Sequence, residues 1–187
     1  MRFRTVAYIL ILLVFVVSAT VAQESSGSED VENTLSRLSA IGLQTVKEPF
    51  DAEDFELPVL SSDVTRTLAS YEGDLVLLNF WASWCPPCVE EMPSMQTLYD
   101  QIGGRGFEIL AVNVQEDPGT VQSFIDENDF SFPVLLDRNG QAARKYAVRG
   151  LPTSYIVDAQ GRILARKVGF HEWDGADTVE TFEALAR

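Results

Sequence analysis

The chain of 187 residues contains two cysteines, and both lie in the segment Trp84-Cys85-Pro86-Pro87-Cys88. The apolar run Leu75–Trp81 before it predicts a buried strand, and Val89–Tyr99 after it has the periodicity of a helix. A Cys-x-x-Cys pair at such a junction puts the first sulfur at a helix N-terminus, where free N–H groups and the helix dipole stabilise a thiolate. We therefore predict a thiol–disulfide exchange centre in which Cys88, one turn further in, is more buried than Cys85.

Other roles of the two cysteines are less favoured. A disulfide across two residues closes too short a loop to remove much entropy from the unfolded chain. Zinc needs four ligands, and besides the thiols there is one distant histidine, His171, so carboxylates would have to complete the shell. Attachment of a c-type haem needs a histidine where Val89 stands. We expect no metal and no organic cofactor, only the redox-active pair Cys85–Cys88.

Residues 1–22 have the pattern of an export segment. Two arginines precede the apolar run Val6–Val17, and Thr20-Val21-Ala22 matches a small-residue cleavage site. The alternative is an uncleaved membrane anchor, because no charge occurs between the arginines and Gln23. Both alternatives predict an extracytoplasmic protein, either periplasmic or held at the outer face of the cytoplasmic membrane.

The composition is that of a soluble globular protein, with 46% hydrophobic and 22% charged residues. The formal net charge is −14. Such an acidic surface argues against nucleic acid and against anionic membrane surfaces as partners.

Residues 23–54 are predicted to be an acidic tether ahead of the main domain. Residues 24–56 contain nine acids against two bases. Apolar residues at helical spacing from Val31 to Ile41 predict a short helix, whereas Lys47–Glu56 is expected to be irregular. Whether this helix docks on the domain or stays on the tether is open.

Residues 55–187 alternate predicted strands with predicted helices. Strands are expected at Phe55–Leu60, Leu75–Trp81, Phe107–Val114, Phe132–Asp137, Ser154–Val157 and Ile163–Val168, the last two as a hairpin. Helices are expected at Cys85–Ile102, Pro118–Asn128, Gln141–Tyr146 and Gly175–Ala186, with a helical turn capped by Ser62 or Asp63 and ending at Tyr71. This order predicts an α/β domain with a mixed central sheet and helices on both faces.

Four motifs, in order along residues 55–187, carry a resemblance to a known family. They are Asn79-Phe80-Trp81-Ala82-Ser83-Trp84-Cys85-Pro86-Pro87-Cys88, Pro93, Gly150-Leu151-Pro152-Thr153, and the hairpin Tyr155-Ile156-Val157-Asp158 with Gly161-Arg162-Ile163. With them the chain resembles the TlpA/ResA-like extracytoplasmic thiol–disulfide oxidoreductases. The resemblance implies a thioredoxin fold with an N-terminal extension of the kind found in that family.

The resemblance also implies catalytic roles. Cys85 matches the nucleophile that attacks a partner's disulfide, and Cys88 matches the thiol that resolves the mixed disulfide. Glu91 matches a partly buried acid that exchanges protons with Cys88, its alternative being a solvated helix residue. Asn79 stands where cytoplasmic thioredoxins have a buried aspartate, so proton transfer must use Glu91 or water.

A contact surface for the partner is implied as well. Pro152 matches the cis-proline beside the active site in this fold, and its cis bond presents the backbone of Leu151 to a partner chain. Trp84, together with Pro86 and Pro87, is expected to complete this substrate-binding surface.

The Pro86-Pro87 dipeptide favours a reducing centre. Neither proline has an N–H, so two donors to a Cys85 thiolate are absent, whereas strong oxidants owe their potency to a stabilised reduced form. We expect a monomeric disulfide reductase that receives electrons from a membrane thiol carrier and acts on exported proteins, as in cytochrome c maturation.

Three alternatives to the reductase remain. They are a disulfide oxidase, a disulfide isomerase, and a thioredoxin-like binding or chaperone module without redox activity. A peroxiredoxin is less favoured, because the residues before Cys85 lack the Pro-x-x-x-Thr-x-x-Cys pattern of those peroxidases.

Overall fold

The computed structural model describes residues 29–186 of the chain. The export segment or anchor expected at residues 1–22 lies outside this part, as do residues 23–28 of the expected tether. Within the part described, no helix is both long and apolar enough to span a bilayer. The choice between a cleaved signal and an anchor therefore stays a prediction.

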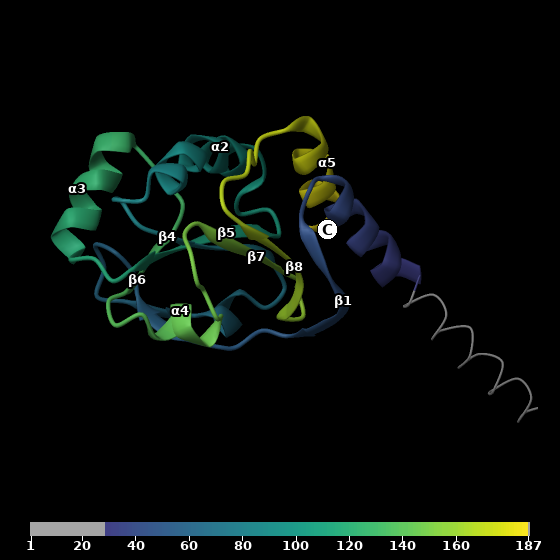
Figure 1. Cartoon of the computed structure of the whole chain (residues 1–187), viewed down its shortest axis with the longest axis horizontal. Helices are drawn as coiled ribbons and strands as arrows, with labels where there is room; N and C mark the ends of the chain where they lie inside the picture. The colour runs from purple at the N-terminus through teal and green to yellow at the C-terminus, as the bar shows by residue number, and fades with distance from the viewer. Residues whose placement is uncertain (1–28, 187) are drawn as a thin grey trace, which may run out of the picture.

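A mixed sheet of six strands forms the centre of the molecule (Figure 1). The strands are β1 (Gln44–Asp51), β4 (Leu75–Trp81), β5 (Phe107–Val114), β6 (Val134–Asp137), β7 (Thr153–Val157) and β8 (Arg162–Val168), in the spatial order β1-β8-β7-β4-β5-β6. Strands β4, β5 and β6 are parallel. Strand β7 runs antiparallel to β4, β8 runs antiparallel to β7, and the edge strand β1 runs antiparallel to β8. The predicted mixed sheet and the β7–β8 hairpin are confirmed.

Helices cover both faces of this sheet, as predicted. The helices are α2 (Pro86–Ile102), α3 (Pro118–Asn128), α4 (Gln141–Lys145) and α5 (Ala176–Leu185), and residues 29–40 are also helical. One apolar core joins α2, α3, α5 and residues 29–40 to the sheet, and a second core joins α4 to the opposite face (Figure 1).

Strand β4 shows why its sequence is apolar without interruption. Its odd-numbered residues Leu75, Leu77 and Trp81 belong to the core under α2. Its even-numbered residues Val76, Leu78 and Phe80 belong to the core over α4. Alternation along a strand covered on both faces requires apolar side chains at nearly every position. The same alternation turns Asn79 toward α2, where the active site lies.

Strand β1 corrects one prediction. The irregular structure expected over Lys47–Glu56 is wrong up to Asp51, because Gln44–Asp51 pairs with β8. The pairing is interrupted between Thr45 and Phe50. Pro49 lies in this interruption on an edge strand, where its missing N–H costs no ladder hydrogen bond.

The helical residues 29–40 dock on the domain, which answers the question that the sequence left open. Leu38 is fully buried and shares a core with Trp173 and Phe182. Together with the pairing of β1 and β8, this contact packs residues before position 55, the predicted start of the domain, onto the folded unit.

After residue 55 the predicted strand is present in shortened form, whereas the helical turn starts later than predicted. Here β2 (Glu56–Pro58) and β3 (Thr65–Thr67) pair as a small antiparallel sheet, and the helical turn is the 3-10 helix η1 (Leu68–Tyr71). Its N-cap is Thr67 rather than Ser62 or Asp63. Thr67 Oγ1 accepts a hydrogen bond from Ser70 N at 3.1 Å, and Ser70 Oγ accepts one from Thr67 N at 3.3 Å. This reciprocal capping box determines where the turn begins.

Candidate active site

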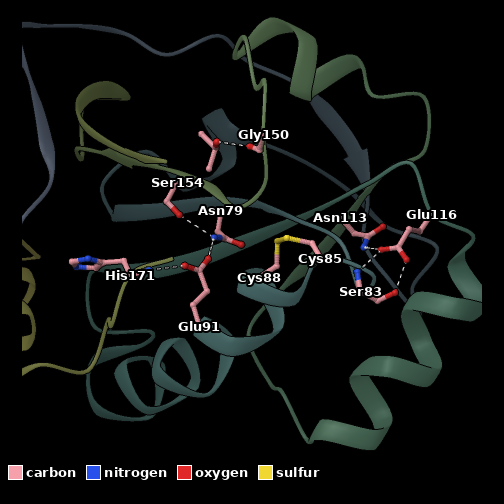
Figure 2. Close-up of a disulfide and its surroundings, with 11 residues drawn as sticks. Asn79, Ser83, Cys85, Cys88, Glu91, Asn113, Glu116, Gly150, Ser154 and His171 are labelled. Atoms are coloured by element: carbon pink, nitrogen blue, oxygen red, sulfur yellow. Dashed lines mark hydrogen bonds between the residues drawn. A yellow bond between two sulfur atoms is a disulfide. The ribbon is translucent and has the colours of Figure 1, made fainter. Parts of the chain in front are cut away.

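The two cysteines form a disulfide at the N-terminus of α2 (Figure 2). Cys85 is the N-cap residue, and the two Cα atoms are 5.3 Å apart. Cys85 is 4% exposed and Cys88 is 0% exposed, so the predicted order of burial is confirmed. A partner that approaches from solvent therefore meets Cys85 first.

The first turn of α2 offers the Cys85 sulfur little hydrogen bonding. Pro86 and Pro87 stand at the first helical positions and have no N–H. The N–H groups of Cys88 and Val89 donate to the Cys85 carbonyl oxygen at 3.0 Å and 3.1 Å. A thiolate on Cys85 would depend on the helix dipole more than on backbone donors from this turn.

The carboxylate of Glu116 anchors the loop before the cysteines through hydrogen bonds. It accepts hydrogen bonds from Ser83 N at 2.7 Å, Ser83 Oγ at 2.5 Å and Asn113 Nδ2 at 2.6 Å (Figure 2). These bonds tie the residue before Trp84 to the end of β5. The sequence analysis did not single out Glu116. It could have been found as an acidic residue just after the predicted strand Phe107–Val114, which pairs with the strand that leads to the cysteines.

Glu91 is 1% exposed and lies three residues past Cys88 on α2, so its alternative as a solvated residue is wrong. Asn79 Nδ2 donates to Glu91 Oε1 at 2.7 Å, and His171 N donates to Oε2 at 3.1 Å. Figure 2 shows the carboxylate directed toward these two residues, with Cys88 one turn earlier on the same helix. The arrangement places an ionisable group on the active-site helix, three residues past the buried Cys88.

Burial raises the pKa of Glu91 from 4.5 to about 7, because loss of water disfavours the carboxylate. The hydrogen bonds from Asn79 and from the His171 backbone oppose this rise, and so does the nearby indole of Trp173. Near neutral pH both protonation states of Glu91 are populated. The carboxyl group is thus suited to give or take a proton.

Two further residues that sequence reasoning missed, Ser154 and Trp173, surround this acid. Ser154 Oγ accepts the second Asn79 Nδ2 hydrogen bond at 2.9 Å. Trp173 Nε1 and Asn79 Oδ1 are buried without a hydrogen-bond partner among residues 29–186. The His171 ring packs on Trp173 with centroids 4.5 Å apart, so its backbone rather than its imidazole contacts Glu91. No local spacing links these residues to Glu91, because they come from separate segments of the chain.

The loop before β7 lies beside the cysteines. The Leu151–Pro152 peptide bond is cis, as the resemblance implies. No backbone hydrogen bond joins Leu151 to another residue of the part described. Cys85 and Leu151 line a groove of about 530 Å³ together with Trp84, Pro86 and Pro87. The structure thus brings together the residues predicted to contact a partner, and Trp84 is 67% exposed.

Two exposed apolar residues, Val168 and Phe170, lie at the end of β8 next to the cis-proline loop. Val168 is 50% exposed and Phe170 is 42% exposed. Gly169 N between them donates to Pro152 O at 2.8 Å. The pair therefore flanks the cis-proline loop, a position that its sequence did not indicate.

Another hollow, of about 560 Å³, is lined by residues of β1, of β8 and of the end of α4 with the turn after it, among them Phe50, Ile163 and Tyr146. No cysteine lines it, so the groove at Cys85 is the better candidate site. In residues 29–186 no three His, Cys, Asp or Glu side chains are grouped so that they could hold a metal ion.

Comparisons with known proteins agree with this geometry. Residues 50–166 match the sequence profile of the AhpC/TSA family. The chain is 43% identical over 115 residues to thiol-disulfide oxidoreductase ResA of Oceanobacillus iheyensis, a match that covers 60% of each protein. It is 36% identical over 138 residues to ResA of Halalkalibacterium halodurans, covering 74% of this chain and 72% of that protein.

A similar fold is known from Chlorobium tepidum. The structure of a protein named for the thiol:disulfide interchange protein DsbE has a TM-score of 0.68 and 32% identity. It covers 76% of this chain and 100% of the other. The match thus spans the whole of the Chlorobium structure but less than two thirds of the length of the Oceanobacillus protein.

Proposed function

We propose that this chain, which belongs to the AhpC/TSA family and has the thioredoxin fold, catalyses thiol–disulfide exchange with protein partners. The observation that carries the proposal is the unequal placement of the two sulfurs. Cys85 lines the groove, while Cys88 is fully buried and lies three residues before Glu91, an acid whose pKa is about 7. The names of the relatives support the same chemistry.

The exchange proceeds in two displacement steps from the dithiol form. The Cys85 thiolate attacks one sulfur of the partner's disulfide, and the other partner sulfur leaves as a thiolate. Cys88 then loses its proton and attacks the Cys85 sulfur, which releases the second partner thiolate. The partner gains two electrons, and the Cys85–Cys88 disulfide forms. Glu91 accepts the Cys88 proton in this scheme, since it lies on the same helix face and Asn79 cannot ionise.

The partner segment binds in an extended conformation. The unpaired backbone of Leu151 offers one N–H and one carbonyl for strand-like pairing. Trp84, Pro86 and Pro87 supply apolar contacts along the groove, and the exposed Val168 and Phe170 offer further apolar contacts next to the cis-proline loop.

We further propose a reductase that acts outside the cytoplasm as a monomer and needs no cofactor besides its disulfide. The missing N–H groups of Pro86 and Pro87 support the reducing direction. A membrane thiol carrier supplies its electrons, and disulfides of exported proteins, including apocytochrome c, are its substrates. An oxidase or isomerase is the second candidate, and the reduction potential of the Cys85–Cys88 pair separates the two directions.

Trapping of the mixed disulfide tests the exchange itself. In Cys88→Ala the resolving thiol is missing, so reduced protein mixed with a disulfide-bonded substrate should accumulate a covalent complex. The complex is detected as a band on non-reducing gels that dithiothreitol removes. Cys85→Ala is the matched control and should trap nothing, because the remaining thiol is buried.

The same variants address a binding or chaperone module without redox activity. Such a module predicts that Cys85→Ala keeps full activity and that neither variant forms a covalent complex. That combination of results would refute the proposed exchange.

A further inference from the structure

One wall of the active-site groove carries positive charge that the protein leaves without carboxylate partners. From residue 138 to residue 157 there are four bases and no acid, although the whole chain has 28 acids and 14 bases. The four bases are Arg138, Arg144, Lys145 and Arg149, and all are exposed. Across residues 29–186 the only ion pair joins Asp158 to Arg162, so none of the four is neutralised by a salt bridge.

Two of these bases, Arg144 and Arg149, line the groove with Cys85 and Trp84, and no Asp or Glu lines it. Arg144 Nη1 donates to the backbone oxygen of Asn139 at 2.7 Å, a neutral acceptor that leaves the charge uncompensated.

The guanidinium group of Arg144 lies close to Gly140. A Cβ added at Gly140 would lie 3.3 Å from Arg144 Nη1 and 3.2 Å from the Gln115 side chain. The guanidinium group thus lies beside Gly140, on the same side of this residue as the Gln115 side chain that follows β5, while Arg144 remains exposed. Glu116, which follows Gln115, is already occupied by three hydrogen bonds from Ser83 and Asn113.

Arg149 stands two residues before Leu151, whose backbone is free to pair. A chain that pairs there and brings a sulfur to Cys85 has to pass along the wall that contains both arginines. Guanidinium groups bind carboxylates with two parallel hydrogen bonds, which orients as well as attracts.

We infer that the groove selects protein segments that carry an acidic side chain beside their reactive cysteine. The inference rests on the proposed function and adds a substrate class to it. Because the net charge of the chain is −14, an acidic segment is repelled by most of the surface and attracted at this wall. The charge pattern therefore directs such a segment to Cys85.

Two disulfide-bonded peptides that differ only by Asp or Asn next to one cysteine test this inference. The second-order rate constant of exchange is measured with the reduced full chain and with Arg144→Gln, Arg149→Gln and the double variant. The ratio of the two rate constants within each protein corrects for any general effect of the substitution. Arg105→Gln removes the same charge near the C-terminus of α2, roughly 25 Å from Cys85 along the helix.

We expect the wild type to favour the Asp peptide about tenfold at low salt, because two nearby charges act on one carboxylate. Each single variant should reduce this ratio about threefold, and the double variant should bring it close to one. Salt at about 0.5 M should largely abolish the preference, since the charges are exposed. Arg105→Gln should keep the wild-type ratio.

Other outcomes contradict the inference in distinct ways. A wild-type ratio near one, a ratio that survives in the double variant, or an equal loss in Arg105→Gln each refutes selection by the groove. If glutathione disulfide reacted as fast as the Asp peptide, Arg144 and Arg149 would attract small anions in general, and selection of protein segments would be refuted. Exchange with neither peptide would contradict the proposed function itself, whereas equal exchange with both contradicts only the preference.

Discussion

At the scale of single residues, Glu91 couples folding to pH. Its pKa rises from 4.5 to about 7 on burial, so the folded protein keeps a proton that the unfolded chain has lost between these values. The contribution of Glu91 to folding is therefore most favourable below about pH 4.5, and it is lost as the pH rises through 7. The loss amounts to about 3 kcal/mol once the group is ionised in both states.

Glu91→Gln should remove this pH dependence, because an amide keeps the shape of the side chain but does not ionise. We expect wild-type stability to decline relative to the variant from about pH 4.5 to above pH 7, as measured by urea denaturation across that range. The rate of exchange should also lose an inflection near pH 7 if Glu91 accepts the Cys88 proton.

Glu90→Gln is the matched control, since Glu90 is the exposed neighbour on the same helix. Its stability should follow the wild type at every pH. Parallel curves for wild type and Glu91→Gln would show that Glu91 does not titrate in this range.

At the scale of elements, α2 and the strands around it follow local rules. Pro86 and Pro87 begin the helix at positions where a missing N–H costs nothing, and the continuous apolar sequence of β4 matches a strand covered on both faces. Strand β1 does not follow such rules, because its pattern of exposed and half-buried residues has no clear alternation. Its pairing with β8 depends on a partner more than a hundred residues away.

The helical residues 29–40 provide a test of how far the folded unit extends. Leu38 is fully buried in the core with Trp173 and Phe182, so Leu38→Ala should lower the free energy of unfolding by about 2–5 kcal/mol. Ser36→Ala, on the exposed side, should change it by less than about 0.5 kcal/mol. Urea denaturation measures both, and equal stability of the two variants would mean that this helix adds nothing to the fold.

At the scale of the whole molecule, redox state and folding are linked. Folding shifts the reduction potential of the Cys85–Cys88 pair by the difference in folding free energy between the oxidised and reduced proteins. A pair that stabilises its thiolate poorly in the folded state favours the disulfide, which is the condition for a reductant. The prolines after Cys85 create this condition by withholding two backbone donors.

We therefore expect the oxidised protein to unfold at a higher urea concentration than the reduced protein. The reduction potential in glutathione or dithiothreitol buffers should lie at or below about −220 mV. A Cys85→Ala/Cys88→Ala double variant should not respond to dithiothreitol and serves as the control. Greater stability of the reduced form, with a potential near about −120 mV, would identify an oxidant and contradict the proposed reductase.

The amino-acid sequence by itself determined the features that act over a few residues. The Cys-x-x-Cys spacing, the strand before it, the helix after it and the hairpin near the C-terminus are all present as predicted. Periodicity, capping and the lack of an N–H on proline depend on close neighbours in the chain, so they are visible without a structure.

Only the tertiary structure decided the properties that depend on distant segments. It joined β1 to β8 and brought Asn79, Ser154 and Trp173 around Glu91. It also set Arg144 and Arg149 along the groove that contains Cys85. The pKa of Glu91 illustrates the physical reason: its rise comes from the removal of water by residues far away in sequence, and that loss of solvation exists only once the chain is packed.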